Sequence, residues 1–310
     1  MCSTYIIIVT YNGEQWIREC LNSCSNFNVI VVDNNSSDNT IAIIKNEYSN
    51  VVLLKQKKNL GFGQANNLGI SYALKNSCDY VFLLNQDAYL KDDCIERLIS
   101  VHLSNTNYGV LSPIHLNGNQ SKLDLNFKNY VSKNNDFLNH HILNLEKKAV
   151  YPVAFVNAAA WLLPIKTLRK VGGFDPIFFH YGEDDNYCQR VSYYNLKIGV
   201  VSDAYVIHDR EFRESKKDLD SNEPQKKCER FFKVQLANVN SNYSKTYKYL
   251  FKSSIKKVIF SVLKFKPPKE GLNNILVLKN IKKEVLSSIN KNTKRSNFLY
   301  LTNKLKTWLL

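Results

Sequence analysis

Short apolar runs alternate with stretches of helical spacing over the first hundred residues of the chain. Four apolar runs predict buried strands at residues 5–9, 29–32, 51–54 and 80–84. Apolar residues then recur every three or four positions, which predicts helices near residues 16–24, 41–48, 63–74 and 95–101. Because the strands are apolar throughout, the alternation indicates a mostly parallel sheet with helices on both faces, an α/β fold.

The pattern changes after the fourth strand and helix. Residues 114–150 are rich in Asn, Lys and His and predict an irregular excursion or hairpin. Order returns at residues 153–163, and further elements are expected as a short helix from Pro164 to Gly172-Gly173, a helix at 184–194, and strands at 197–201 and 204–207. Beyond residue 223 we expect helices only, with a break at Pro267-Pro268. We therefore divide the chain into an α/β domain at residues 1–209 and a mainly helical region at residues 210–310.

Composition is that of a globular protein, with 44% hydrophobic and 22% charged residues. The charge is uneven, because residues 1–209 carry a net −1 and residues 210–310 carry +16. Such asymmetry favours an anionic partner for the basic region: membrane phospholipid, a lipid pyrophosphate or nucleic acid. A basic helix that is only solvated is the alternative. The seven cysteines are scattered without a Cys-x-x-Cys pair, which favours free thiols in the cytosol over zinc or disulfides.

Polar clusters follow three of the predicted strands, at Thr10-Tyr11-Asn12, Asp33 to Asp38, and Asn85-Gln86-Asp87. Ligands bind at the carboxyl ends of parallel strands, so these clusters are candidate site residues. Asp33 suits a base N–H or ribose hydroxyl, although a turn-forming role would also explain it. Asp87 suits a hard divalent cation that bridges phosphate oxygens, with a plain polar loop as the alternative.

Three consecutive acids, Glu183-Asp184-Asp185, open the helix predicted at 184–194. The helix dipole stabilises one or two carboxylates there, but a third acid is harder to explain by capping. Mutual repulsion and apolar neighbours would raise one pKa, as a general base requires. His208 ends the last predicted strand and suits a metal or phosphate contact, or a purely structural role.

The motifs occur in one order along the chain: Thr10-Tyr11-Asn12, Val32 to Asp38, Asn59-Leu60-Gly61-Phe62-Gly63 with Asn67 and Gly69, Leu84 to Ala88, Gly172-Gly173-Phe174-Asp175, Tyr181-Gly182-Glu183-Asp184 with Arg190, and His208. In this order and spacing they resemble glycosyltransferase family 2 with the GT-A fold, and most of all its bacterial rhamnosyltransferase-like branch. The resemblance covers residues 4 to about 209.

The resemblance implies an inverting glycosyltransferase that moves a sugar from a nucleotide-diphosphate donor to a saccharide or a lipid-linked saccharide. It implies Asp184 as catalytic base beside Glu183 and Asp185, and a divalent metal, Mn or Mg, on Asp87 and His208. The implied nucleotide-sugar site comprises Thr10, Tyr11, Asn12, Asp33, Asn59, Gly63, Asn67, Asn85, Gln86 and Asp87. We expect residues 114–150, Asn157 and Trp161 to face the acceptor. The implied process is synthesis of a bacterial surface polysaccharide, such as capsule or O-antigen.

Two positions depart from the family pattern. Asn85 stands where the family's Asp-x-Asp motif has its first acid, which removes a charge from the metal site. Asn186 stands where the family often has a further acid, and Asp185 is placed to substitute for it. A non-catalytic saccharide-binding or membrane-interaction protein on the same fold therefore stays open. A nucleotidyltransferase does not fit, because Thr10 to Glu14 is not a Gly-rich, basic phosphate loop.

The basic region contains apolar residues at helical spacing between Phe251 and Leu263, with lysines among them. This pattern predicts a basic amphipathic helix suited to the cytoplasmic face of an anionic membrane. A polyprenyl-pyrophosphate-linked acceptor would be found there. A helix packed against the catalytic domain is the alternative. Nucleic-acid binding is disfavoured since no nucleic-acid module is recognisable. We expect neither a signal peptide nor a transmembrane helix, and hence a cytoplasmic protein peripheral to the plasma membrane.

Overall fold

A computed structural model describes residues 2–210, 224–294 and 296–301. Its centre is a mixed nine-stranded sheet with the order β3-β2-β1-β4-β8-β6-β9-β5, in which β7 also pairs with β9. The first four strands in that order run parallel to one another: β1 (Thr4–Thr10), β2 (Asn28–Asp33), β3 (Val52–Lys55) and β4 (Tyr80–Asn85). The four strands predicted from the apolar runs are therefore confirmed.

The other half of the sheet reverses direction at β8. Its strands are β5 (Ala88–Leu90), β6 (Tyr108–Asn117), β7 (Val150–Val153), β8 (Ala160–Pro164) and β9 (Lys197–His208). β8 is antiparallel to both β4 and β6, whereas β6 and β9 are parallel. The two strands expected at 197–201 and 204–207 are one continuous strand, and the sequence analysis missed β6.

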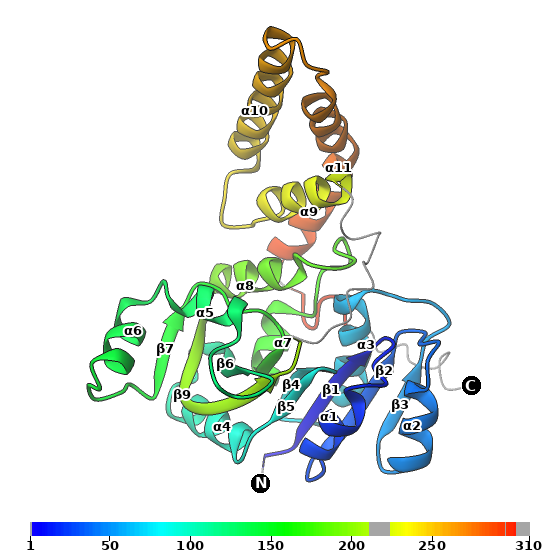
Figure 1. Cartoon of the computed structure of the whole chain (residues 1–310), viewed down its shortest axis with the longest axis vertical. Helices are drawn as coiled ribbons and strands as arrows, with labels where there is room; N and C mark the ends of the chain where they lie inside the picture. Colours follow the sequence, from blue (N-terminus) through cyan, green and yellow to red (C-terminus); the bar gives the residue numbers. More distant parts are fainter. Residues whose placement is uncertain (1, 211–223, 295, 302–310) are drawn as a thin grey trace.

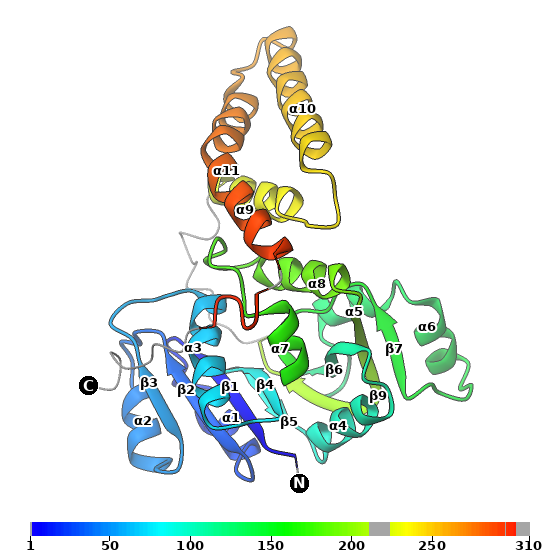
Figure 2. The ribbon, with the colours of Figure 1, turned by 180° about the vertical axis from the view of Figure 1, so that it is seen from behind.

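Two helical layers cover the sheet (Figures 1 and 2). One apolar core includes residues of α1 (Ile17–Ser23), α2 (Thr40–Glu47) and α4 (Cys94–Ser104). The other includes residues of α3 (Phe62–Lys75), α7 (Ile165–Val171) and α8 (Glu183–Tyr193). Side chains alternate along a strand, so Ile7 of β1 enters the second core while Ile6 and Ile8 enter the first. This two-sided burial explains why the parallel strands are apolar throughout.

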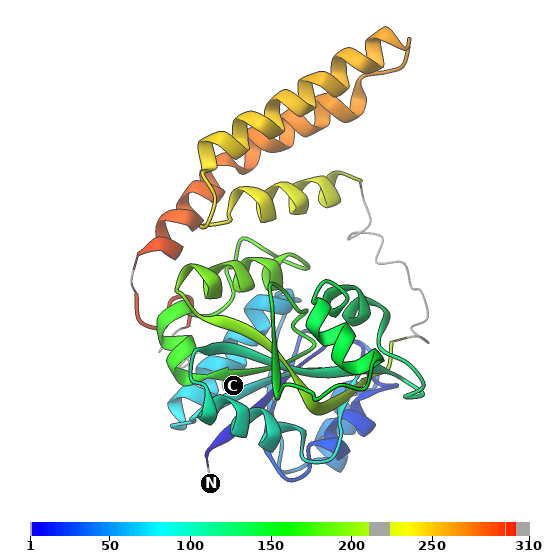
Figure 3. The same ribbon diagram turned by 90° about the vertical axis from the view of Figure 1, so that its left-hand side faces the viewer.

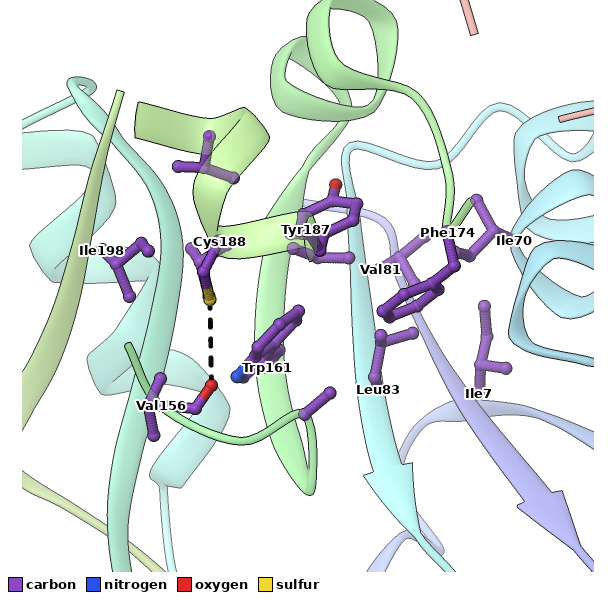
Figure 4. Packing of buried hydrophobic residues seen from close by; sticks show 14 of the residues in the cluster. Ile7, Ile70, Val81, Leu83, Val156, Trp161, Phe174, Tyr187, Cys188 and Ile198 are labelled. Carbon is purple, nitrogen blue, oxygen red and sulfur yellow. Dashed lines mark hydrogen bonds between the residues drawn. The ribbon is translucent and has the colours of Figure 1, made fainter. Parts of the chain in front are cut away.

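Trp161 lies inside the second core and does not face an acceptor. Its side chain is fully buried and packs against the rings of Phe174 and Tyr187, as Figure 4 shows. The pairing of Trp161 with Leu83 places it in the interior of strand β8, so its ring must point to one face of the sheet. The expectation of an acceptor contact at Trp161 is therefore wrong.

Residues 114–150 are more ordered than the sequence predicts. They include the end of β6 and two short helices, α5 (Leu125–Val131) and α6 (Asn135–Ile142). Each helix begins at a polar cap, since Asp124 accepts hydrogen bonds from two main-chain N–H groups of α5 and Asn134 accepts one from α6. The predicted irregular excursion is therefore wrong, and the caps are the sequence signal that was overlooked.

The described part of the C-terminal region contains three helices, α9 (Pro224–Leu236), α10 (Tyr243–Leu263) and α11 (Lys269–Thr293), in agreement with the helices expected beyond residue 223. Pro267-Pro268 separates α10 from α11, which confirms the predicted break. These helices form a third apolar core with Phe178 of the loop before α8. Figure 3 shows α10 and α11 as a hairpin that extends away from the sheet.

Candidate active site

The carboxyl ends of β1, β2 and β4 meet at one edge of the sheet. Thr10 pairs with Asp33 on one side, while Val9 pairs with Asn85 on the other. The Oγ1 atom of Thr10 donates a hydrogen bond to Oε1 of Gln86 at 2.7 Å, and the Tyr11 main-chain N–H donates to the same oxygen at 3.0 Å. The fold thus brings together the first and third polar clusters found in the sequence.

Asp33 is fully buried at this edge, and its two carboxylate oxygens differ in their surroundings. Oδ2 accepts hydrogen bonds from the main-chain N–H groups of Asn35 and Ser36 at 3.2 and 3.1 Å. Oδ1 has no hydrogen-bond partner among the described residues. A buried acceptor without a donor is costly, so Oδ1 is a position where a ligand's N–H or O–H would be stabilised. The turn-forming and ligand-binding interpretations of Asp33 therefore apply to different oxygens of one side chain.

The loops around this edge hold one another in place. Asn12 accepts a hydrogen bond from the Ser37 main-chain N–H at 2.8 Å, which joins the loops after β1 and β2. Asn59 accepts one from the Gly61 N–H at 2.8 Å and shapes the turn into α3. Gly61 has a φ of 78°, and a Cβ there would lie 1.9 Å from the carbonyl oxygen of Phe179, so only glycine fits.

Gly63 and Asn67 support the loop before α8. The amide of Asn67 donates to the Phe174 carbonyl at 2.8 Å and accepts from the Phe174 N–H at 2.7 Å. A Cβ on Gly63 would lie 2.9 Å from Cβ of Phe174, which makes this a close packing position. Both residues hold the Gly172–Asp175 segment through these contacts, and their predicted contact with a nucleotide stays a prediction.

Asp87 and His208 face each other across the pairing of β5 with β9. The Nε2 atom of His208 lies 3.6 Å from Oδ1 of Asp87, and its Nδ1 atom lies 3.8 Å from Oδ2 of Asp124. All three side chains are buried, and neither ring nitrogen of His208 has a hydrogen-bond partner among the described residues. Asp124 also accepts two hydrogen bonds from Arg210, at 2.7 and 2.9 Å.

Asp87 and His208 fit a divalent cation whose other ligands would come from a diphosphate. No group of three metal-binding side chains occurs in the described part of the chain. Mg²⁺ and ions of similar hardness are commonly held by one or two protein ligands together with phosphate oxygens and water. A carboxylate oxygen beside an imidazole nitrogen that lacks a hydrogen bond supplies those two ligands.

The three acids begin α8, directly after Gly182, whose φ of 90° lies in the left-handed region. Glu183 is buried, whereas Asp184 and Asp185 are half-buried. Burial, followed by the charge of Asp184, raises the pKa of Glu183 to about 8. Burial, followed by the charge of Asp185, raises the pKa of Asp184 to about 7, and burial also raises the pKa of Asp185. Asp184 thus titrates near neutral pH, which suits a general base.

Asp184 and Asp185 line a cavity of about 400 Å³ with Tyr130, Lys133 and three other residues, Phe155, Tyr181 and Gly182. A neighbouring cavity of about 240 Å³ is lined by Asp185, Phe155, Ala154, Cys188, Gln189, Ser192 and Asn240. Tyr130 and Lys133 come from the excursion that was expected to face the acceptor. Asn240 follows α9, so the C-terminal region also reaches the acid cluster.

Tyr130 connects the two halves of the site. Burial, followed by the charge of Asp184, raises its pKa to about 12, and the charge of Arg210 acts in the opposite direction. Its hydroxyl therefore lies within electrostatic reach of both the acid cluster and the Asp124–Arg210 pair. No sequence motif marks Tyr130, Lys133 or Phe155, because these residues meet the acid cluster only through the fold. Asn157 is half-buried nearby, with an Oδ1 that has no hydrogen-bond partner among the described residues.

Comparison with known proteins agrees with this arrangement. Residues 5–160, half of the chain, match the model of Glycosyl transferase family 2. The chain is 26% identical over 210 residues to the low-salt glycan biosynthesis hexosyltransferase Agl10 of Haloferax volcanii, covering 66% of each chain. It is 23% identical over 210 residues to the dTDP-rhamnosyl transferase RfbF of Shigella flexneri, covering 66% of this chain and 68% of RfbF. It is 25% identical over 221 residues to the rhamnosyltransferase WbbL of Escherichia coli, covering 66% and 82%.

Two solved structures share the fold. The crystal structure of S. aureus TarS 1-349 in complex with UDP superimposes with a TM-score of 0.51 at 18% identity, covering 81% of this chain and 70% of TarS. The structure of GalNAc-T7 with UDP, GalNAc and Mn²⁺ superimposes with a TM-score of 0.60 at 13% identity, covering 93% and 58%. The expected GT-A fold and the resemblance to rhamnosyltransferases are confirmed. The chain belongs to glycosyl transferase family 2 and is a glycosyltransferase of the GT-A fold.

Proposed function

We propose that the chain is an inverting hexosyltransferase that moves a sugar from a nucleoside-diphosphate donor to a saccharide or lipid-linked saccharide acceptor. The observation that carries the proposal is Asp184, whose pKa is raised to about 7 beside a cavity of about 400 Å³. A carboxylate that titrates near neutral pH and borders a solvent-accessible cavity can take a proton from an acceptor hydroxyl. The matches to RfbF and WbbL support a role in bacterial surface polysaccharide synthesis.

The donor would lie across the sheet edge formed by β1, β2 and β4. Asp33 would accept from a base N–H or a ribose hydroxyl through Oδ1, the oxygen without a partner. Thr10, Tyr11 and Gln86 form the connected floor of this edge. The TarS structure, which contains UDP, and the name of RfbF support a pyrimidine nucleotide, so UDP and dTDP sugars are the first donors to test.

The diphosphate would lie toward Asp87 and His208, which fit a divalent Mn or Mg ion. Such a cation, when bound, would neutralise negative charge on the leaving nucleoside diphosphate. Asp124 lies beside Nδ1 of His208 and forms an ion pair with Arg210, so the charge of Arg210 balances that of Asp124 there. The GalNAc-T7 structure, which contains Mn²⁺, supports a divalent cation in this chain, whereas the choice of Asp87 and His208 rests on their geometry.

The acceptor hydroxyl would approach Asp184 from the cavity. Asp184 takes its proton as the acceptor oxygen forms a bond to the anomeric carbon, and the bond from that carbon to the diphosphate oxygen breaks on the opposite face. One displacement inverts the anomeric configuration and needs no covalent sugar intermediate. Glu183, with the higher pKa of the pair, keeps its proton longer and so limits the negative charge beside Asp184.

Product detection with a panel of nucleotide sugars tests the proposal. The purified chain, a saccharide acceptor and either UDP or dTDP sugars should give a glycosylated product in the presence of Mn²⁺ or Mg²⁺. Nuclear magnetic resonance of the product should show inverted anomeric configuration. Nucleotide binding without transfer across the panel and acceptors would favour the alternative, a saccharide-binding protein on the same fold. A retained configuration would refute the single displacement.

A further inference from the structure

The α10–α11 hairpin ends in a cluster of apolar side chains that nothing in the described structure covers. We call residues 259–272 the hairpin tip. Its exposed apolar residues are Ile259, Phe260, Val262, Leu263, Phe265 and Leu272, each between 53% and 99% exposed. Phe265 is the extreme case, at 99% exposed and with a φ of 53°, in the left-handed region that bulky residues avoid. Apolar surface gathered in this way marks an interaction site.

The same tip is strongly basic. Lys264, Lys266 and Lys269 are exposed within it, and Lys256 and Lys257 are exposed one turn before it. Its one acid, Glu270, is paired with Lys257. Apolar side chains mixed with lysines, almost without acids, complement a bilayer with anionic headgroups, since lysine stems lie along apolar surface while their amines reach phosphate.

The base of the hairpin is packed on its inner side, and its remaining exposed apolar residues, such as Tyr249 and Leu276, are scattered rather than gathered as they are at the tip. Leu250 and Ser254 of α10 are buried, as are Val277 and Ile281 of α11. A Cβ on Gly271 would lie 2.7 Å from the Val258 main-chain nitrogen, so the two backbones approach closely near the tip. No helix within the described ranges is long and apolar enough to cross a membrane.

The geometry points to a bilayer containing anionic phospholipid as the partner: the hairpin tip inserts Leu263, Phe265 and their neighbours among the headgroups. A 21-residue helix such as α10 is about 30 Å long, so the tip stands away from Asn240 and the cavities beside Asp185. Contact with a membrane through the tip leaves the cavities open to an acceptor. The inference does not depend on sugar transfer, because binding to lipid is measurable without a donor.

Vesicle flotation of the full chain tests the inference, with phosphatidylcholine vesicles that contain or lack phosphatidylglycerol. Each buried apolar side chain contributes about 1.5–3 kcal/mol and each lysine about 1 kcal/mol, so L263S/F265S and K264E/K266E should each weaken binding to the anionic vesicles at least about tenfold. A matched control, L103S/I142S, replaces two apolar residues that are 62% and 74% exposed elsewhere and should bind like the wild type. Because all these side chains are exposed, the variants should keep the wild-type unfolding midpoint.

Three results would overturn the inference. Unchanged flotation of L263S/F265S would show that the tip does not enter the bilayer, and equal loss in L103S/I142S would show that the effect is not local. The third is absence of vesicle binding by the wild type. In that case, sedimentation velocity showing a dimer that L263S/F265S converts to a monomer would assign the tip to a second copy of the chain. Retention of an RNA oligonucleotide would assign it to nucleic acid.

Discussion

The buried carboxylate of Asp175 joins the C-terminal region to the loop before α8, and its loss should separate them. Oδ2 of Asp175 accepts hydrogen bonds from Ser288 at 2.6 Å, Asn292 at 2.7 Å and Tyr300 at 3.1 Å. Oδ1 accepts a further one from the Ile177 N–H at 3.1 Å. Burial, followed by the charge of Asp175, raises the pKa of the Tyr300 phenol, so that hydroxyl stays a donor. The perturbation is therefore Asp175→Ala.

The magnitude follows from the donors left behind. Ser288 and Asn292 are 2% and 0% exposed, so water does not readily replace the carboxylate. A buried donor without a partner costs about 1–3 kcal/mol, so these two donors, with a smaller part from the half-buried Tyr300, give about 3–5 kcal/mol in the free energy of unfolding. Asp175→Asn keeps the shape and one acceptor oxygen but turns an amide nitrogen toward Ser288 and Asn292 or toward the Ile177 N–H. We expect that variant to cost about 1–2 kcal/mol.

The assay combines urea denaturation, followed by circular dichroism, with hydrogen exchange of residues 281–293. Asp175→Ala should lower the free energy of unfolding by the stated amount, and amides in α11 should lose protection before those in β1 and β4. Asp203→Ala is the matched control, because Asp203 is an exposed acid whose ion pair with Arg97 should be worth less than about 1 kcal/mol. If Asp175→Ala and Asp203→Ala destabilise equally, or if α11 keeps its protection, the reasoning is refuted.

Four further predictions concern the active site. Asp184→Asn should lower the rate of transfer about 10²–10⁴-fold, while its nucleotide affinity, measured by calorimetry, should stay within about twofold of the wild type. Asp185→Asn should lower the rate of transfer far less. An inactive Asp185→Asn variant together with an active Asp184→Asn variant would assign the base to Asp185. Asp87→Asn should abolish the gain in nucleotide affinity that Mn²⁺ or Mg²⁺ gives, and an unchanged gain would reject Asp87 as a ligand. The transfer rate should rise with pH through about 7, where Asp184 loses its proton. The pKa of Glu183 is raised from 4.5 to about 8, so the stability that its protonated form contributes is present below about pH 4.5 and is lost as the pH rises through 8. Glu183→Gln should therefore reduce the fall in the free energy of unfolding over that pH range.

The parallel half of the sheet was predictable because its signals are local. Each of β1 to β4 is a short apolar run that ends at a polar segment, and the helices that follow these strands show apolar residues at helical spacing. The strand-end clusters were predictable for the same reason, since parallel strands bring their carboxyl ends to one edge. Thr10, Asp33 and Gln86 accordingly lie where the sequence analysis expected them.

The antiparallel half of the sheet was harder to predict from the sequence, because its strands pair with partners that are distant in sequence. β8 pairs with β4 about eighty residues away, and nothing in Ala160–Pro164 specifies that partner or its direction. Trp161 shows the consequence for function. Trp161 was expected to face the acceptor, but the side to which its ring points depends on a register that only the folded sheet defines.

The acid cluster shows how a local motif acquires its chemistry from distant residues. Glu183-Asp184-Asp185 is visible in the sequence, but a capped, solvated helix start would leave all three acids with ordinary pKa values. Val234 of α9 packs so closely beside Gly182 that a Cβ added to Gly182 would lie 2.8 Å from Cγ2 of Val234, and this contact covers one side of the acid cluster. Tyr130 and Phe155 line the cavity side of the cluster. The resulting burial is the largest cause of each raised pKa. The C-terminal region thereby contributes to the burial of the acid cluster and also anchors the loop through Asp175, so the base proposed at Asp184 would depend on residues on both sides of residue 209.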